Sequence, residues 1–266
     1  MSAPPVAGVG APGRARIAAR TLRTDRYWVG PALTVAVLLA FVVYATIRAF
    51  MGRDYYAAPY ISPLYSPCLA TRCVPGSGEL HVVGDWWRLS PALLVLIFPL
   101  GFRMTCYYYR KAYYRAFWAS PTACAVPEPR AGYTGETRFP LVLQNSHRYF
   151  FYIGLIFNVI LTWDAILGFR NSEGEWGHMG LGTLILLTNA VLLWLYSLSC
   201  HSCRHAVGGR LKHFSKHPLR YKAWTLVSRL NPRHMQFAWI SLFGVALTDL
   251  YVYLLATGAI TDLRFF

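Results

Sequence analysis

Long apolar runs recur along this 266-residue chain. A run of about 20 apolar residues is long enough to cross the hydrocarbon core of a bilayer as a helix. The chain lacks the alternation of apolar and polar positions over about ten residues that is typical of membrane β-strands. We therefore predict an all-α integral membrane protein, a bundle of five transmembrane helices at residues 28–50, 91–109, 149–169, 179–199 and 235–256.

Composition supports this fold class, because 55% of the residues are hydrophobic and only 14% are charged, an imbalance that soluble domains do not show. The second run is the weakest, since Arg103 interrupts it near one end. We expect a disordered basic tail at 1–27, the anchor domain at 28–258 and a short tail at 259–266. No internal repeat is evident. The first apolar run lacks a persuasive signal-peptide cleavage site, so we expect it to be a retained helix.

Lys and Arg are concentrated in alternate connecting segments. Residues 1–26, 110–148 and 204–233 hold 19 of the 26. Because cytoplasmic loops of membrane proteins are enriched in Lys and Arg, we predict a cytoplasmic N-terminus and an external C-terminus. The net charge of +15 then reflects topology and attraction to anionic lipid of the plasma membrane. Binding to nucleic acid is not expected, because the chain has no soluble basic domain.

The six cysteines divide between the two predicted sides of the membrane. Cys68 and Cys73 fall in an outer loop, where oxidising conditions favour a small structural disulfide. The other four fall at cytoplasmic helix ends or in cytoplasmic loops, where thiols stay reduced: Cys106, Cys124, Cys200 and Cys203.

Most histidines gather at the same predicted depth, so that thiols and imidazoles from four chain segments could converge there. Both are ligands for metal ions, and convergence from several helices is a stronger signal than a single helix-end histidine. The candidate metal ligands are Cys106, Cys200, Cys203, His147, His205 and His234, with Cys124 in reserve.

Three readings of this cluster differ in the group that it would hold. Structural zinc commonly uses two Cys pairs, whereas residues 200–203 form a single Cys-x-x-Cys. Heme b needs two histidines from different helices, and the first two predicted spans contain none. Mixed thiolate and imidazole ligation is the Rieske pattern, although the usual Rieske loop motifs are missing. We favour a Rieske-like [2Fe–2S] cluster, with heme b as the alternative and no metal as the remaining possibility.

Four motifs carry a family resemblance: CYYYRKAYYRAFW (106–118), NSHRYFFY (145–152), SCHSCRHAVGGRLKHFSKHP (199–218) and RHMQFAWISLFGVALTDLYVYLLA (233–256). They resemble the membrane-anchor subunit of actinobacterial succinate dehydrogenases, over roughly residues 28–258. The resemblance implies partnership with a flavoprotein subunit, which oxidises succinate, and an iron–sulfur subunit. It also implies that this chain passes electrons to menaquinone. Anchors of the wider family carry two b hemes, and the histidine positions of this chain depart from that pattern. A higher oligomer is left open.

Reduction of a quinone requires hydrogen-bond donors at both carbonyls, close to the last electron carrier. We expect the quinone pocket at the cytoplasmic surface, and the candidate residues are Asn145, Ser146, Arg148 and Trp239.

Ionisable residues inside a bilayer are costly and are functional candidates for that reason. Asp164 and Asp249 lie in the outer halves of the third and fifth predicted spans and are candidates for proton transfer. The alternative is that each is a helix-end aspartate reached by water.

Two other functions compete with the enzyme-subunit hypothesis. The chain could anchor a different quinone-linked dehydrogenase, although such anchors would require histidines within their helices. It could also be a non-redox metal-binding or scaffold membrane protein, in which the cysteines and histidines hold a colourless metal or none.

The predicted topology is testable with reporter fusions after Arg138 and after Leu211. Both should report the cytoplasm, because the basic segments that contain them are expected inside. An external signal at either position would overturn the topology.

Overall fold

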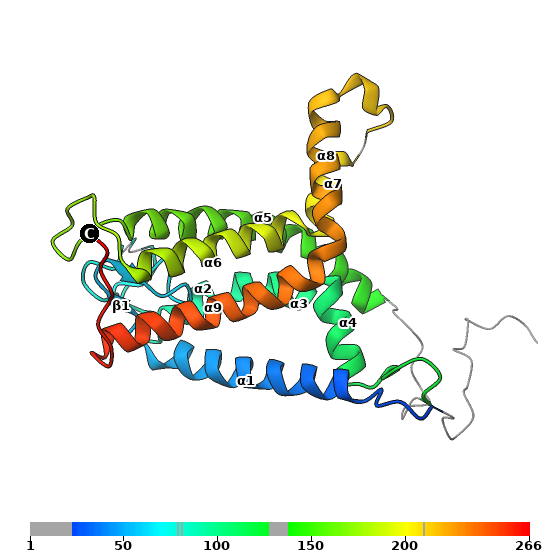
Figure 1. Ribbon diagram of the computed structural model, residues 1–266, viewed down its shortest axis with the longest axis horizontal. Helices are drawn as coiled ribbons and strands as arrows, with labels where there is room; N and C mark the ends of the chain where they lie inside the picture. Colours follow the sequence, from blue (N-terminus) through cyan, green and yellow to red (C-terminus); the bar gives the residue numbers. More distant parts are fainter. Residues whose placement is uncertain (1–22, 79, 81, 128–137, 210) are drawn as a thin grey trace, which may run out of the picture.

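The computed structural model describes residues 23–78, 80, 82–127, 138–209 and 211–266, so most of the predicted disordered tail lies outside the described residues. Four long helices run side by side (Figure 1): α1 (Val29–Met51), α5 (Arg138–Leu167), α6 (Leu181–Leu198) and α9 (His234–Ala256). α6 packs against both α5 and α9, and α3 (Ile97–Thr105) packs against α5. Each long helix contains a stretch long and apolar enough to cross a membrane, so four of the predicted spans are helices that are candidate spans.

The second predicted span is not one straight helix. It divides into α2 (Ala92–Val95), α3 and the start of α4 (Tyr107–Ala116), and the chain bends by 73° at Cys106. The stretch is a fifth span only if the bent pair is counted as one. The sequence of α4, YYYRKAYYRA, explains the bend, because basic and phenolic side chains prefer the membrane–water interface to hydrocarbon.

A second break follows α6. The segment between α6 and α9, expected as a loop, contains α7 (His201–Gly208), η1 (Phe214–Lys216), α8 (Pro218–Leu230) and η2 (Asn231–Arg233). Figure 1 shows α7 and α8 standing away from the bundle, at the same end as α4. We call the end of the bundle that carries α4, α7 and α8 the cysteine–histidine end, and the opposite end of the bundle the disulfide end.

The disulfide end is closed by the connection between α1 and α2. This connection contains a small antiparallel ribbon of β1 (Tyr56–Ala57) and β2 (Tyr60–Ile61), so the fold is mostly rather than wholly helical. The predicted disulfide between Cys68 and Cys73 is present. The C-terminal residues fold back here, and Asp262 accepts a hydrogen bond of 3.0 Å from the backbone N–H of Gly182.

The long helices expose apolar side chains along their length. α1 is the clearest case, with Leu33, Val43 and Phe50 all more than half exposed. Such exposure would be costly in water but suits contact with lipid tails, which are as apolar as the side chains themselves.

A buried ion pair joins α1 to α9 near the disulfide end. Asp249 is fully buried, and its carboxylate accepts hydrogen bonds from Arg48 at 2.8 and 3.2 Å. The hydroxyl groups of Tyr44 and Ser62 donate to the same carboxylate. A bidentate pair with all of these donors is a strong tie between elements distant in sequence.

Replacing Asp249 with Ala should destabilise the protein by about 3–5 kcal/mol, because Arg48 would be left buried without a counter-charge. The temperature at which the purified protein loses its folded helices in mild detergent measures the effect. The double variant Arg48→Met, Asp249→Leu should recover part of the loss. Asp25→Ala is the control, because its ion pair with Arg23 is exposed. Equal effects of Asp249→Ala and Asp25→Ala would contradict the assignment.

Candidate functional site

Two helix breaks, each made by a cysteine, form the frame of the site. Cys106 follows α3 with φ −62° and ψ 131°, and Cys200 follows α6 with φ −68° and ψ 146°. In both cases an extended residue caps the next helix, α4 or α7. The local sequences share one pattern, an aromatic residue followed three positions later by a hydroxyl residue and then by cysteine: FRMTC at 102–106 and YSLSC at 196–200.

Each of these cysteines lies against a histidine from another helix. The Sγ atom of Cys106 lies 3.3 Å from Nε2 of His234 on α9. The Sγ atom of Cys200 lies 3.0 Å from Nε2 of His147 on α5. All four side chains are at least nine-tenths buried. Four helical segments therefore bring two thiols and two imidazoles together at one end of the bundle.

The second nitrogen of each imidazole contacts a hydroxyl group. Nδ1 of His147 lies 2.9 Å from Oγ1 of Thr105, and Nδ1 of His234 lies 2.8 Å from Oγ of Ser199. The contacts are crossed. Thr105 precedes Cys106 but contacts His147, the histidine that faces Cys200. Ser199 precedes Cys200 but contacts His234, the histidine that faces Cys106. The two helix ends are thus interlocked, each orienting the imidazole that the other's thiol contacts.

Aromatic rings fix the planes of the imidazoles in the same crossed pattern. Phe102 stacks on His147 with ring centroids 5.0 Å apart and planes 9° apart. Tyr196 stacks on His234 with the corresponding values of 5.1 Å and 11°. Each aromatic residue is the first of its motif, so both motifs make the same contacts.

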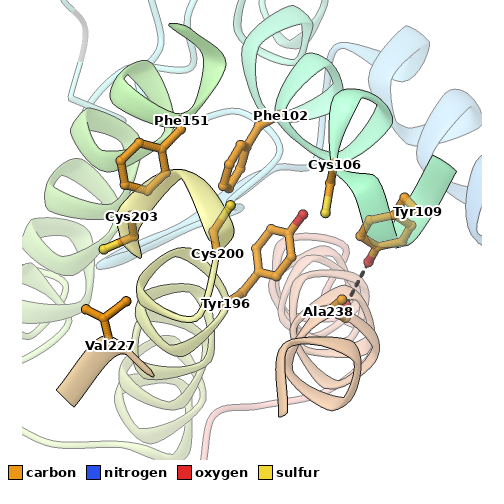
Figure 2. Close-up of a cluster of buried hydrophobic side chains, with 9 residues drawn as sticks. All are labelled: Phe102, Cys106, Tyr109, Phe151, Tyr196, Cys200, Cys203, Val227 and Ala238. Carbon is orange, nitrogen blue, oxygen red and sulfur yellow. Dashed lines mark hydrogen bonds between the residues drawn. The ribbon is translucent and has the colours of Figure 1, made fainter. Parts of the chain in front are cut away.

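Phe102 and Tyr196 also meet each other, with ring centroids 5.2 Å apart. Figure 2 shows the thiols of Cys106 and Cys200 pointing toward the region that these two rings flank. The hydroxyl of Tyr196 is buried there beside the thiol of Cys106. A buried phenol needs a polar partner, and this sulfur supplies one.

A fixed positive charge lies beside this region. Arg103 donates to the carbonyl oxygen of Ala238 at 3.2 Å and to the hydroxyl of Ser241 at 3.1 Å. Its guanidinium carbon lies 4.7 Å from the ring centroid of Tyr196. Arg103, the residue that interrupts the second apolar run, is thus a cation whose hydrogen-bond acceptors lie on α9. Its positive charge favours a negatively charged group nearby.

Burial controls the charge of the thiol that follows α6. It raises the pKa of the Cys200 thiol to about 12, so this group carries its proton at neutral pH unless a metal displaces it.

Cys203 and His205 are not brought to the same place. Cys203 is buried, but Figure 2 shows its sulfur pointing away from Cys106, and His205 is exposed on α7. Cys124 is exposed. Within the described part of the chain, no three His, Cys, Asp or Glu side chains are close enough to hold one metal ion. The four-residue set is thus two thiol–imidazole pairs rather than a single-ion cage.

A cavity of about 750 Å³ opens beside the pairs, between α1, α4 and the start of α9. His234 lines it, so the cavity and the thiol–imidazole set share a residue. Trp239 lines it too, and its Nε1–H donates to the hydroxyl of Tyr108, another lining residue. The volume is in the range of sites that bind small organic ligands.

Of the four candidate quinone residues, only Trp239 lines this cavity among the described residues. Asn145 and Arg148 are exposed on α5, and Ser146 is half-buried there. The spacing of the NSHR motif could not show that these side chains lie outside the lining of the cavity.

Both candidate proton carriers lie near the disulfide end. Asp164 is half-buried and accepts a hydrogen bond from the hydroxyl of Ser66 in the connection between α1 and α2. Asp249 is the buried partner of Arg48. Because a helix rises about 1.5 Å per residue, Asp164 is roughly 25 Å along α5 from His147.

Residues 29–258 match a family described as actinobacterial succinate dehydrogenase subunit SdhC. The chain belongs to this family. It is also similar to a chain of the solved structure "Mycobacterium smegmatis Sdh1 complex in the apo form", with 58% identity over 97% of this chain and 99% of that one, and a TM-score of 0.86. A search of the curated proteins found no match.

This succinate dehydrogenase membrane subunit is therefore a multi-pass membrane protein that works in a complex with other subunits. The resemblance carried by the four motifs is confirmed, as are the membrane location and the role as a subunit of an enzyme. Family membership decides against the anchor of a different dehydrogenase.

Sequence reasoning missed four residues of this SdhC subunit that orient the histidines: Phe102, Thr105, Tyr196 and Ser199. The signal was available, because both motifs read aromatic, two residues, hydroxyl, cysteine. A five-residue similarity is too short to stand out as a repeat, and its meaning depends on which histidine each motif meets.

Proposed function

We propose that this subunit passes electrons from the iron–sulfur subunit to menaquinone through a Rieske-like [2Fe–2S] cluster. Cys106, Cys200, His147 and His234 would hold the cluster. One observation carries the proposal: two buried thiols and two buried imidazoles from four helical segments face one another at one end of the bundle.

The residues fit such a group in number and in kind. Two thiolates and two imidazoles are the donor set of Rieske centres. The hydroxyl of Tyr196, beside the thiol of Cys106, adds a buried hydrogen-bond donor next to a proposed ligand.

When bound, a [2Fe–2S] cluster supplies a carrier that accepts one electron at a time. The protein's own residues set the conditions for it. Phe102 and Tyr196 keep water away from the ligands, while Arg103 favours the more negative reduced state.

The cavity that His234 lines is the site that we propose for the menaquinone head group. It borders a proposed ligand, so the distance for electron transfer would be short. At its wall the hydroxyl of Tyr108 accepts the indole N–H of Trp239 and keeps its own proton to donate to a quinone carbonyl.

The predicted topology would place the cysteine–histidine end in the cytoplasm. There the basic and aromatic surface of α4 would receive the flavoprotein and iron–sulfur subunits, and the remaining basic residues would face anionic lipid. The cavity wall includes Lys111 and Arg115, and the exposed His201 also lines it. Protons for the quinone could therefore enter from this end.

Proton transfer from the disulfide end would need a long route. Of the two candidate carriers, Asp164 has the surroundings better suited to exchange, because a hydroxyl is its described partner. Asp249 is held in a buried ion pair with Arg48 and is less free to exchange a proton with a neighbour. If Asp164 does carry protons, Asp164→Asn should slow quinone reduction and leave succinate oxidation by a soluble acceptor unchanged.

The cluster proposal is tested by paramagnetic resonance of the purified complex. A reduced [2Fe–2S] signal with histidine nitrogen couplings should be present, and Cys200→Ser or His234→Gln should remove it together with quinone reduction. Succinate oxidation by a soluble acceptor should survive, because that chemistry is on a partner subunit.

Cys203→Ser and His205→Gln are the matched controls for that experiment, because their side chains lie outside the two pairs. Both should keep the signal. A Soret band that disappears in His234→Gln would indicate heme b instead and would overturn the cluster proposal.

The quinone proposal predicts that Trp239→Leu raises KM for a soluble menaquinone analogue about fivefold, since Tyr108 loses the N–H that orients its hydroxyl and about 1 kcal/mol is expected for one lost hydrogen bond. The cluster signal should be unchanged. Arg148→Gln is the control, because Arg148 lies outside the cavity. An equal rise in KM for both variants would place the quinone elsewhere.

A further inference from the structure

We infer that Thr105 and Ser199 are positioning residues that hold both histidines with the proton on Nδ1 and the Nε2 lone pair aimed at the proposed centre. This inference rests on the proposed function, because it names the nitrogen through which each histidine would act. It concerns two hydroxyl groups that touch no thiol in the contacts described above.

The direction of the hydrogen bonds follows from the number of protons available. A hydroxyl has one proton to donate and lone pairs with which to accept. Oγ1 of Thr105 lies 2.7 Å from the carbonyl oxygen of Gly101, and Oγ of Ser199 lies 3.0 Å from that of Tyr196. A carbonyl can only accept, so each hydroxyl proton has a backbone acceptor within reach. The lone pairs are then free to accept Nδ1–H from the imidazole.

The opposite arrangement would conflict with ligation. If Thr105 donated to Nδ1 of His147, the ring proton would sit on Nε2, the atom 3.0 Å from Cys200. Nε2 could not then bind iron. The same holds for Ser199, His234 and the thiol of Cys106. The hydroxyl partner of one ring nitrogen thus fixes what the other can do, as is common for metal-bound histidines.

The protein contains the same arrangement at a place where the direction is certain. Oγ1 of Thr162 donates to the carbonyl oxygen of Asn158 at 2.6 Å and accepts the indole N–H of Trp194 at 2.9 Å. An indole nitrogen can only donate. A helical threonine here therefore accepts a ring N–H while its own proton goes to the carbonyl four residues earlier.

Burial and stacking keep these bonds from exchanging with water. Thr105 is 6% exposed and Ser199 is 0% exposed. The ring of Phe102 covers one face of the His147 imidazole, and the ring of Tyr196 covers one face of the His234 imidazole. This stacking opposes rotation of either imidazole out of its plane.

The nitrogen assignment can be tested directly in the assembled complex. Histidine labelled with ¹⁵N at Nδ1 only, or at Nε2 only, is incorporated, and nuclear couplings to the reduced centre are measured by pulsed paramagnetic resonance. The strong coupling expected of a coordinated nitrogen should come from the Nε2 label alone. Strong coupling from the Nδ1 label would overturn the inference and leave the cluster intact. Absence of any histidine coupling in the native complex would overturn the proposed function, and this inference with it.

Variants test the two hydroxyls. Thr105→Val and Ser199→Ala should each reduce retention of the centre roughly 10- to 100-fold, which is the usual effect of removing a partner that orients a metal ligand. They should also shift the midpoint potential of the centre that remains. Thr105→Ser and Ser199→Thr keep the hydroxyl and should restore both properties.

Thr162→Val is the matched control, because it removes a hydroxyl with the same two bonds away from the histidines. Succinate oxidation by a soluble acceptor confirms assembly of each variant. If Thr105→Val and Ser199→Ala behave like Thr162→Val, the two hydroxyls have only a structural role and the inference fails.

Discussion

A helix that ends within a membrane protein has to satisfy its freed polar groups without help from bulk water, and two helices of this subunit meet that constraint in the same way. An extended cysteine follows the end of each helix, directly after α3 and one residue later after α6, and it stands at the N-cap of the next helix. The residues before these cysteines use their hydroxyls and rings to hold histidines of α5 and α9. The breaks therefore create the site and also tie four helical segments together.

The crossed pattern gives the site its mechanical stability. Because α3 orients the histidine that faces the thiol of α6, and the reverse, neither helix end can shift without disturbing both pairs. The buried and stacked imidazoles are held rigidly, as the proposed electron carrier would require of its ligands.

The opposite end of the bundle is organised around charge rather than thiols. Asp249 and Arg48 join α9 to α1, and the hydroxyl of Ser62 connects them to the connection between α1 and α2 that contains the disulfide. α1 has little buried surface along its length, so this pair is an important tie between α1 and the bundle. The ion pair at the disulfide end thus attaches α1 to the bundle, while the cysteine–histidine end contains the residues of the proposed chemistry.

The sequence by itself determined the membrane class, the approximate spans and the disulfide, because apolar runs and cysteine placement depend on local composition. It also brought Cys106, Cys200, His147 and His234 into one candidate set, since their depth in the membrane follows from the spans. It could not separate them from Cys203 and His205. That choice depends on the direction in which α7 leaves α6 and on which face of the helix meets α5, and both are set by packing between distant segments. The roles of Thr105 and Ser199 were decided by tertiary structure alone, because each binds a histidine on a different helix.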